Sequence, residues 1–212
     1  MISKITFIFL SVSALSLSQA FLFGFGPFTP GDYKPWRLGT CLVPTPVKNF
    51  QPEKFFKGHW YVQNHCGNFE WILPGICPTT EYNVTQDGDI LELDYHYIPI
   101  TGRYKEKRAH SNTKLIKNGE GHLPMTFEFL RGLHPMDVPT FILGTDYENW
   151  AVVYYCKQQQ VLKFEESLIL TRKRDDEEIW QPVLDTLKLN KLDYRYFKPT
   201  VNTGCAPNEP HL

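Results

Sequence analysis

Short segments typical of β-strands, separated by turn signals, follow one another from about residue 41 to residue 172, and this succession constrains the fold more than any other feature. The clearest segment is 90–98, where one face is apolar and the other polar. Its apolar face consists of Leu91, Leu93, Tyr95 and Tyr97. Turn signals such as Asp87-Gly88 separate the segments, and no helical stretch lies between them. The pattern predicts an all-β protein with antiparallel strands.

About eight strands are expected, followed by one helix. The strands are 58–63, 79–85, 90–98, 104–115, 125–129, 141–145, 150–156 and 161–172. An apolar stripe after them, formed by Ile179, Val183, Leu184 and Leu187, predicts a helix that begins in the acidic run 175–178. Pro182 indicates either a kink or a later start. This order is typical of an eight-stranded up-and-down β-barrel packed by a C-terminal helix, a size that can hold one small ligand.

The start of the chain has the pattern of a secretory signal peptide, with Lys4, an apolar stretch and a Ser18-Gln19-Ala20 cleavage site. Because the apolar stretch is shorter than the roughly 20 residues that span a bilayer, we expect a secreted protein without a membrane anchor. The expected organisation is signal peptide 1–20, irregular Gly-, Pro- and Phe-rich arm 21–40, barrel with helix and tail 41–205, and C-terminal end 206–212.

Charge and motif content exclude several function classes. The formal net charge of −1 provides no electrostatic footprint for nucleic acid and no polybasic membrane patch. No Ser-His-Asp arrangement, phosphate loop or paired-carboxylate motif indicates catalysis. The seven histidines are scattered, without the spacing typical of a zinc site. We therefore expect no catalytic residues, no metal and no required cofactor.

Export also determines how the cysteines are interpreted. The five are Cys41, Cys66, Cys77, Cys156 and Cys205. In an oxidising compartment we expect them to pair and to leave one over. The sequon Asn83-Val84-Thr85 predicts glycosylation of Asn83 in the same compartment.

Three segments resemble the lipocalin motifs, in the family's order. Residues 55–61 (FFKGHWY) resemble the Gly-x-Trp motif of the first strand. Residues 144–156 (GTDYENWAVVYYC) resemble the second motif, and 168–172 (LILTR) resemble the third, an Arg that ends the last strand. Over residues 41–205 the chain is similar to the lipocalins, and within them to apolipoprotein D, the insect bilin-binding proteins and the crustacean carotenoid-binding lipocalins.

The resemblance implies structural roles and a disulfide pattern. Arg172 is expected to lie over the Trp60 indole as a cation–π partner at the barrel floor. The expected floor residues are Gly58, Trp60, Thr145, Asp146, Tyr147 and Arg172. The implied disulfides are Cys41–Cys156 and Cys77–Cys205. Cys66 departs from the family pattern: it is free, pairs with a partner chain, or replaces Cys77.

Strand alternation gives candidate pocket residues. If Asn83 carries sugar, its side chain points outward, so the side chains directly before and after it in the strand point inward. On 150–156 either Trp150, Val152 and Tyr154 or Ala151, Val153 and Tyr155 face in, because a slip of one residue reverses the assignment. The candidates are Thr80, Tyr82, Val84, Leu91, Leu93, Tyr95, Tyr97, Met125, Phe127, Phe129, Val152 and Tyr154.

These features predict a secreted carrier of a small hydrophobic ligand: a lipid, sterol, retinoid, bilin or carotenoid, of which the bilin or carotenoid would be a bound chromophore. One alternative is a secreted interaction module with a vestigial cavity, in which the Phe-rich arm docks and the chain forms homo- or hetero-oligomers. Others are a thiol-dependent lipid isomerase that uses Cys66, activated by Asn64 and His65, and a haem or metal protein with histidine ligands.

Overall fold

The computed structural model describes residues 37–67, 75–129, 134–176 and 178–212. The predicted signal peptide (1–20) and most of the predicted arm (21–40) lie outside these residues. Within the described part of the chain, no helix is long and apolar enough to cross a lipid bilayer.

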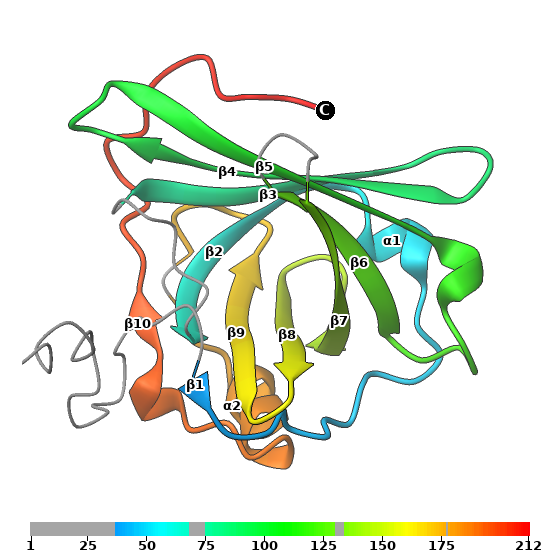
Figure 1. Cartoon of the computed structure of the whole chain (residues 1–212). Coiled ribbons are helices and arrows are strands. Elements are labelled where there is room, and N and C mark those ends of the chain that lie inside the picture. The colour runs from blue at the N-terminus through cyan, green and yellow to red at the C-terminus, as the bar shows by residue number, and fades with distance from the viewer. Residues whose placement is uncertain (1–36, 68–74, 130–133, 177) are drawn as a thin grey trace, which may run out of the picture.

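Eight antiparallel strands form one closed barrel (Figure 1). They are β2 Gly58–Gly67, β3 Ile76–Val84, β4 Asp89–Ile98, β5 Arg103–Asn112, β6 His122–Phe129, β7 His134–Thr145, β8 Trp150–Gln159 and β9 Leu162–Thr171. Each strand pairs with the next in sequence, and the pairing of β9 with β2 closes the barrel. Two short strands, β1 (Arg37–Leu38) and β10 (Lys198–Pro199), pair with β9 and β2. The predicted fold class is therefore confirmed.

Aromatic side chains fill the end of the barrel at which β2 begins. The short helix α1 (Pro52–Phe55) and the residue after it bring Phe55 and Phe56 into the interior, where both are buried. The ring centroid of Phe55 lies 5.3 Å from that of Trp60, and the centroid of Phe56 lies 5.1 Å from that of Tyr82. We call this end the closed end of the barrel.

Arg172, directly after β9, ties the closed end together. Its guanidinium carbon lies 3.6 Å from the centroid of the Trp60 ring, which confirms the expected cation–π contact. Its nitrogens donate hydrogen bonds to the carbonyls of Lys54, Phe55, Lys57, His59 and Tyr147. Burial lowers the pKa of Arg172 to about 10, which leaves the side chain charged at neutral pH. One cation thus joins α1, the start of β2 and the turn after β7.

The turn after β7 presents its carbonyl to Arg172 through a local hydrogen-bond network. The Asp146 carboxylate accepts hydrogen bonds from the backbone N–H groups of residues 148–150. The Thr145 hydroxyl accepts one from the Tyr147 N–H at 2.8 Å, and Tyr147 adopts a φ of 68°. Gly58, which begins β2, has a φ of 61°, a conformation that favours glycine.

Helix α2 (Gln181–Leu189) packs on the outer face of β7 and β8. Val183 and Leu187 are buried in one cluster with Leu143 and Val152. The helix begins after the acidic run, and Pro182 lies in its first turn, where a missing N–H breaks no helical hydrogen bond. The start predicted within 175–178 is therefore wrong, and the later start indicated by Pro182 is confirmed.

Two disulfides cross-link the chain. Cys41–Cys156 joins the segment before β2 to β8, and Cys77–Cys205 joins β3 to the C-terminal segment, which we define as residues 200–212. These are the two pairs implied by the family resemblance. Cys66 carries a free thiol, so it does not replace Cys77.

The packing of Trp60 at the closed end leads to a prediction about stability. Trp60→Ala is expected to lower the free energy of unfolding by about 3–5 kcal/mol, because it removes a fully buried indole and the surface on which Arg172 lies. Thermal or denaturant unfolding measures this. Tyr196→Ala, at a side chain that is 46% exposed, is the control and should change stability by less than about 0.5 kcal/mol. An unchanged melting temperature for Trp60→Ala would contradict the prediction.

Candidate ligand-binding site

The register between strands determines which side chains face the barrel interior. Trp60 is fully buried at the closed end, and its cross-strand partner on β3 is Thr80. Thr80 in turn pairs with Asp94 on β4, and Asp94 pairs with Lys107 on β5. Because directly paired residues share one face of a sheet, all four face the interior. The level nearer the closed end consists of Gly58, Tyr82, Glu92, Ala109 and Phe127.

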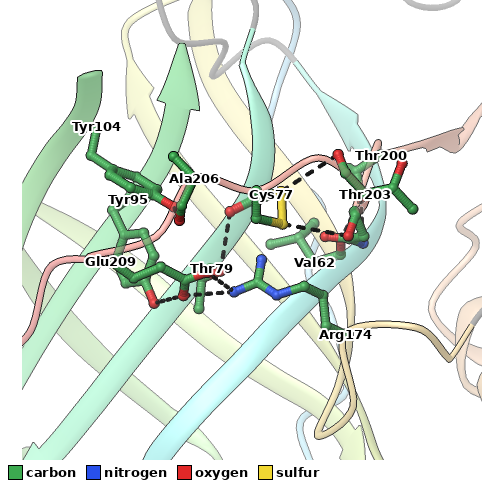
Figure 2. Close-up of a disulfide and its surroundings, with 12 residues drawn as sticks. Val62, Cys77, Thr79, Tyr95, Tyr104, Arg174, Thr200, Thr203, Ala206 and Glu209 are labelled. Carbon is green, nitrogen blue, oxygen red and sulfur yellow. Dashed lines mark hydrogen bonds and ion pairs between the residues drawn. A yellow bond between two sulfur atoms is a disulfide. The ribbon is translucent and has the colours of Figure 1, made fainter. Parts of the chain in front are cut away.

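The prediction that the apolar face of β4 lines the interior is wrong. The outer face carries Leu91, Leu93, Tyr95 and Tyr97, and the inner face carries Ile90, Glu92, Asp94 and His96. The Tyr95 hydroxyl donates to Glu209 at 2.8 Å, and the Tyr104 hydroxyl donates to the Ala206 carbonyl at 2.6 Å. The C-terminal segment therefore crosses the outer face of β4 and β5 (Figure 2). Leu93 and Tyr95 are buried although they lie outside the barrel.

On the other strands, some of the predicted pocket residues face the interior and others do not. Thr80, Tyr82, Val84, Met125 and Phe127 face inward as predicted. Val152 and Tyr154 lie on the outer face of β8 in the cluster under α2, so their prediction is wrong and the alternative set, Ala151, Val153 and Tyr155, faces inward. The Phe129 side chain lies outside the described residues. A role in ligand binding stays a prediction for all of them.

Glu92 is the most unusual interior side chain. It is 1% exposed, and no hydrogen bond of normal geometry reaches either carboxylate oxygen from the described residues. Burial, and then the charge of Asp94, raise the pKa of Glu92 well above its ordinary value of 4.5. The phenols of Tyr82 and Tyr155 lie in the same buried cluster, and burial followed by the charge of Glu92 raises the pKa of both.

Asp94 lies two residues after Glu92 on the same inner face of β4, and its carboxylate has partners. Its carboxylate accepts a hydrogen bond from the Thr80 hydroxyl at 2.7 Å and forms an ion pair with the Lys107 ammonium at 2.9 Å. The same ammonium lies 4.3 Å from the centroid of the Phe127 ring. The Lys107 and Asp94 side chains are 9% and 14% exposed, so solvent reaches this pair while Glu92 beneath it is sealed.

A second polar pair lies across β2 and β9. A register shift after Val62 turns His65 inward opposite Leu168, and its Nδ1 lies 3.0 Å from a carboxylate oxygen of Glu166. Farther along β4, burial and then the charge of Lys105 lower the pKa of His96 to about 4. The interior is thus an apolar lining with ionisable groups at several depths, an arrangement suited to an amphiphilic molecule.

Sequence reasoning missed these ionisable residues, although a signal was present. Glu92, Asp94 and His96 alternate as regularly as the apolar residues between them. Alternation identifies two faces and does not say which one is inside, and charged residues favour the assignment of their face to solvent.

Asn83 is exposed on β3, pointing away from the interior as the sequon required. The modification itself stays a prediction.

Cys66 lies on the outer face of β2, against the cluster covered by α2. Burial, and then the charges of Glu166 and Glu165, raise the pKa of its thiol to about 11. Because the thiolate is the nucleophilic form, this environment opposes the isomerase hypothesis.

The fold and the closed-end motif together define the protein as a lipocalin. The chain belongs to the Triabin family, whose model matches residues 38–180.

Apolipoprotein D of Macaca fascicularis is 27% identical over 187 residues, which cover 85% of this chain and 92% of that protein. Among solved structures, H1 crustacyanin from the lobster Homarus americanus has a TM-score of 0.61 at 20% identity and covers 83% of this chain and 94% of its own. The tryptamine complex of the amine-binding protein of Rhodnius prolixus has a TM-score of 0.61 at 18% identity, with coverages of 77% and 86%. The structural likenesses show the shared fold.

The environment of Cys66 predicts slow alkylation. In native protein near pH 7, iodoacetamide should label this thiol far more slowly than in denaturant, because burial keeps it protonated. Mass spectrometry of timed samples measures both rates. Rapid stoichiometric labelling of the folded protein near pH 7 would show that the thiol is activated.

Proposed function

We propose that this protein is a secreted carrier, and not an enzyme, of a small amphiphilic molecule whose cationic group pairs with Glu92 inside the barrel. The single observation that carries the proposal is the sealed Glu92 carboxyl, which no well-formed hydrogen bond reaches from the described residues. An ionised carboxylate is unfavourable in such a place unless it is paired. Burial and the charge of Asp94 therefore favour the neutral form of Glu92, and a cation that reached the carboxyl would favour its ionisation.

Two interior bases are already engaged. Lys107 pairs with Asp94 at 2.9 Å, and His65 lies 3.0 Å from Glu166. A cation supplied by a ligand would give Glu92 an opposite charge of its own, which its neighbours Asp94 and Tyr82 do not provide. The neighbouring rings of Tyr82 and Phe127 provide apolar and aromatic surface for the rest of such a molecule.

This chemistry narrows the ligands expected from the sequence. The carboxylate of a fatty acid would add a negative charge beside Asp94 and would not favour ionisation of Glu92, and a carotenoid hydrocarbon would offer Glu92 no polar group. An amphiphilic amine satisfies both requirements. The Rhodnius prolixus protein, crystallised with tryptamine, is a precedent for an amine in this fold, while the argument for this chain depends on its own Glu92.

Secretion is part of the proposal. It is supported by the signal-peptide pattern of residues 1–20 and by two disulfides, which persist in oxidising compartments.

Binding of tryptamine tests the proposal directly. Wild-type protein should bind it saturably in a calorimetric or tryptophan-fluorescence titration, and Glu92→Gln should weaken binding about 10- to 100-fold. This is the loss expected for a charge-assisted hydrogen bond of about 1.5–3 kcal/mol.

Glu106→Gln is the matched control, because Glu106 is exposed on the outer face of β5, and it should bind as the wild type does. The neutral analogue tryptophol should bind wild type and Glu92→Gln with similar affinity. Equal tryptamine affinity for wild type and Glu92→Gln would overturn the proposal, as would the absence of saturable binding.

The pKa of Glu92 also predicts how stability depends on pH. Because burial and Asp94 raise this pKa in the folded state, the group contributes its full stability below about 4.5, and that contribution is lost as the pH rises toward the folded-state pKa. Glu92→Gln cannot ionise, so the melting temperature of ligand-free Glu92→Gln should fall less than that of wild type between about pH 4 and pH 8. Parallel curves for the two proteins would contradict the assignment.

A further inference from the structure

Three potential metal ligands converge on the outside of the barrel, away from the proposed ligand site. His59 on β2 and Glu81 on β3 are cross-strand partners. His59 faces outward, since it alternates with the inward-facing Trp60. His211, an exposed residue of the C-terminal segment, is the third member of the cluster.

The distances in this cluster do not fit hydrogen bonds. His59 Nε2 lies 3.8 Å from Glu81 Oε1, and His211 Nδ1 lies 3.7 Å from Glu81 Oε2. Both separations exceed hydrogen-bond length, yet one donor atom from each residue lies within 4.8 Å of the other two. Around a four-coordinate ion with bonds of about 2.0–2.2 Å, neighbouring ligand atoms are about 3.3–3.5 Å apart. The three side chains therefore need only small rotations to share one ion.

We propose that His59, Glu81 and His211 bind one divalent transition-metal ion of the zinc class. Two imidazole nitrogens and one carboxylate oxygen suit zinc, whereas calcium and magnesium prefer sites made of oxygen ligands. A fourth position is left for water because the cluster lies at the surface.

Neighbouring contacts hold two of the ligands in place. The His59 ring stacks on Tyr61, with centroids 6.3 Å apart and planes 9° from parallel, and the guanidinium of Arg174 lies 4.4 Å from the Tyr61 ring centroid. The backbone N–H of Leu212 donates to the Glu81 carboxylate at 3.0 Å. Such supporting contacts orient ligands before the ion binds.

Binding of the ion would attach the end of the C-terminal segment to the barrel. That segment is already joined to β3 by Cys77–Cys205, and its Glu209 forms an ion pair with Arg174 at 2.7 Å (Figure 2). The metal would add an attachment at His211, beside the hydrogen bond from the Leu212 N–H to Glu81, and would further fix the segment over the outer face of the barrel.

Zinc titration of the disulfide-bonded protein, prepared without a polyhistidine tag and stripped with chelator, tests the proposal. We expect one equivalent of Zn²⁺ to bind in competition with a chromophoric chelator. His59→Ala and His211→Ala should each weaken binding more than tenfold. Amide hydrogen exchange at residues 206–212 should slow when Zn²⁺ is added to wild type and should not change for His211→Ala.

His110→Ala is the matched control, because His110 lies 3.6 Å from Glu128 on the surface without a third ligand in the described chain. It should bind zinc as the wild type does. Circular dichroism establishes that each variant is folded. The proposal is overturned if wild type takes up no stoichiometric zinc, if the His59 and His211 variants retain wild-type affinity, or if His110→Ala loses binding.

Discussion

The fold depends on the placement of one guanidinium over one indole. Arg172 covers Trp60 and donates to carbonyls that belong to α1, to the start of β2 and to the turn after β7. Those carbonyls lie at or near the ends of regular elements, where backbone groups often need partners from side chains. A planar cation with several donors can satisfy them together, which a lysine could not. The closed end is therefore both plugged by aromatic rings and cross-linked by a single charge.

Much of this architecture could be predicted from the sequence. Turn residues and short strand-like segments, clearest where apolar and polar residues alternate in 90–98 and 125–129, located the eight strands, because these signals are local to each segment. The resemblance to the lipocalin motifs implied the closed end and both disulfides. The start of α2 was less accessible: charge near a helix terminus favours an early start, but Pro182 and the packing of Val183 determine where the helix begins.

The content of the interior could not be predicted, and β4 shows why. Its apolar face lies outside because the C-terminal segment, more than 100 residues later, covers Tyr95 through Glu209. A contact with a segment so distant in the sequence cannot be read from the alternating pattern of the strand. The same limit applies to the cluster of His59, Glu81 and His211. The register of β2 with β3 and the return of the C-terminal segment bring these residues together, and their spacing in the sequence is not typical of a metal site. At Glu92, local stability and the proposed function conflict, as is common where a protein keeps a polar group for a ligand.

The connectivity of the two disulfides has a consequence for a chain exposed to proteases. Cys41–Cys156 and Cys77–Cys205 overlap in sequence from 77 to 156, so neither covalent loop is contained within the other. A single backbone cleavage anywhere between 41 and 205 therefore leaves the two fragments joined by at least one sulfur–sulfur bond. The barrel can be nicked once without losing a piece of itself, and fragments separate only after reduction or a second cut.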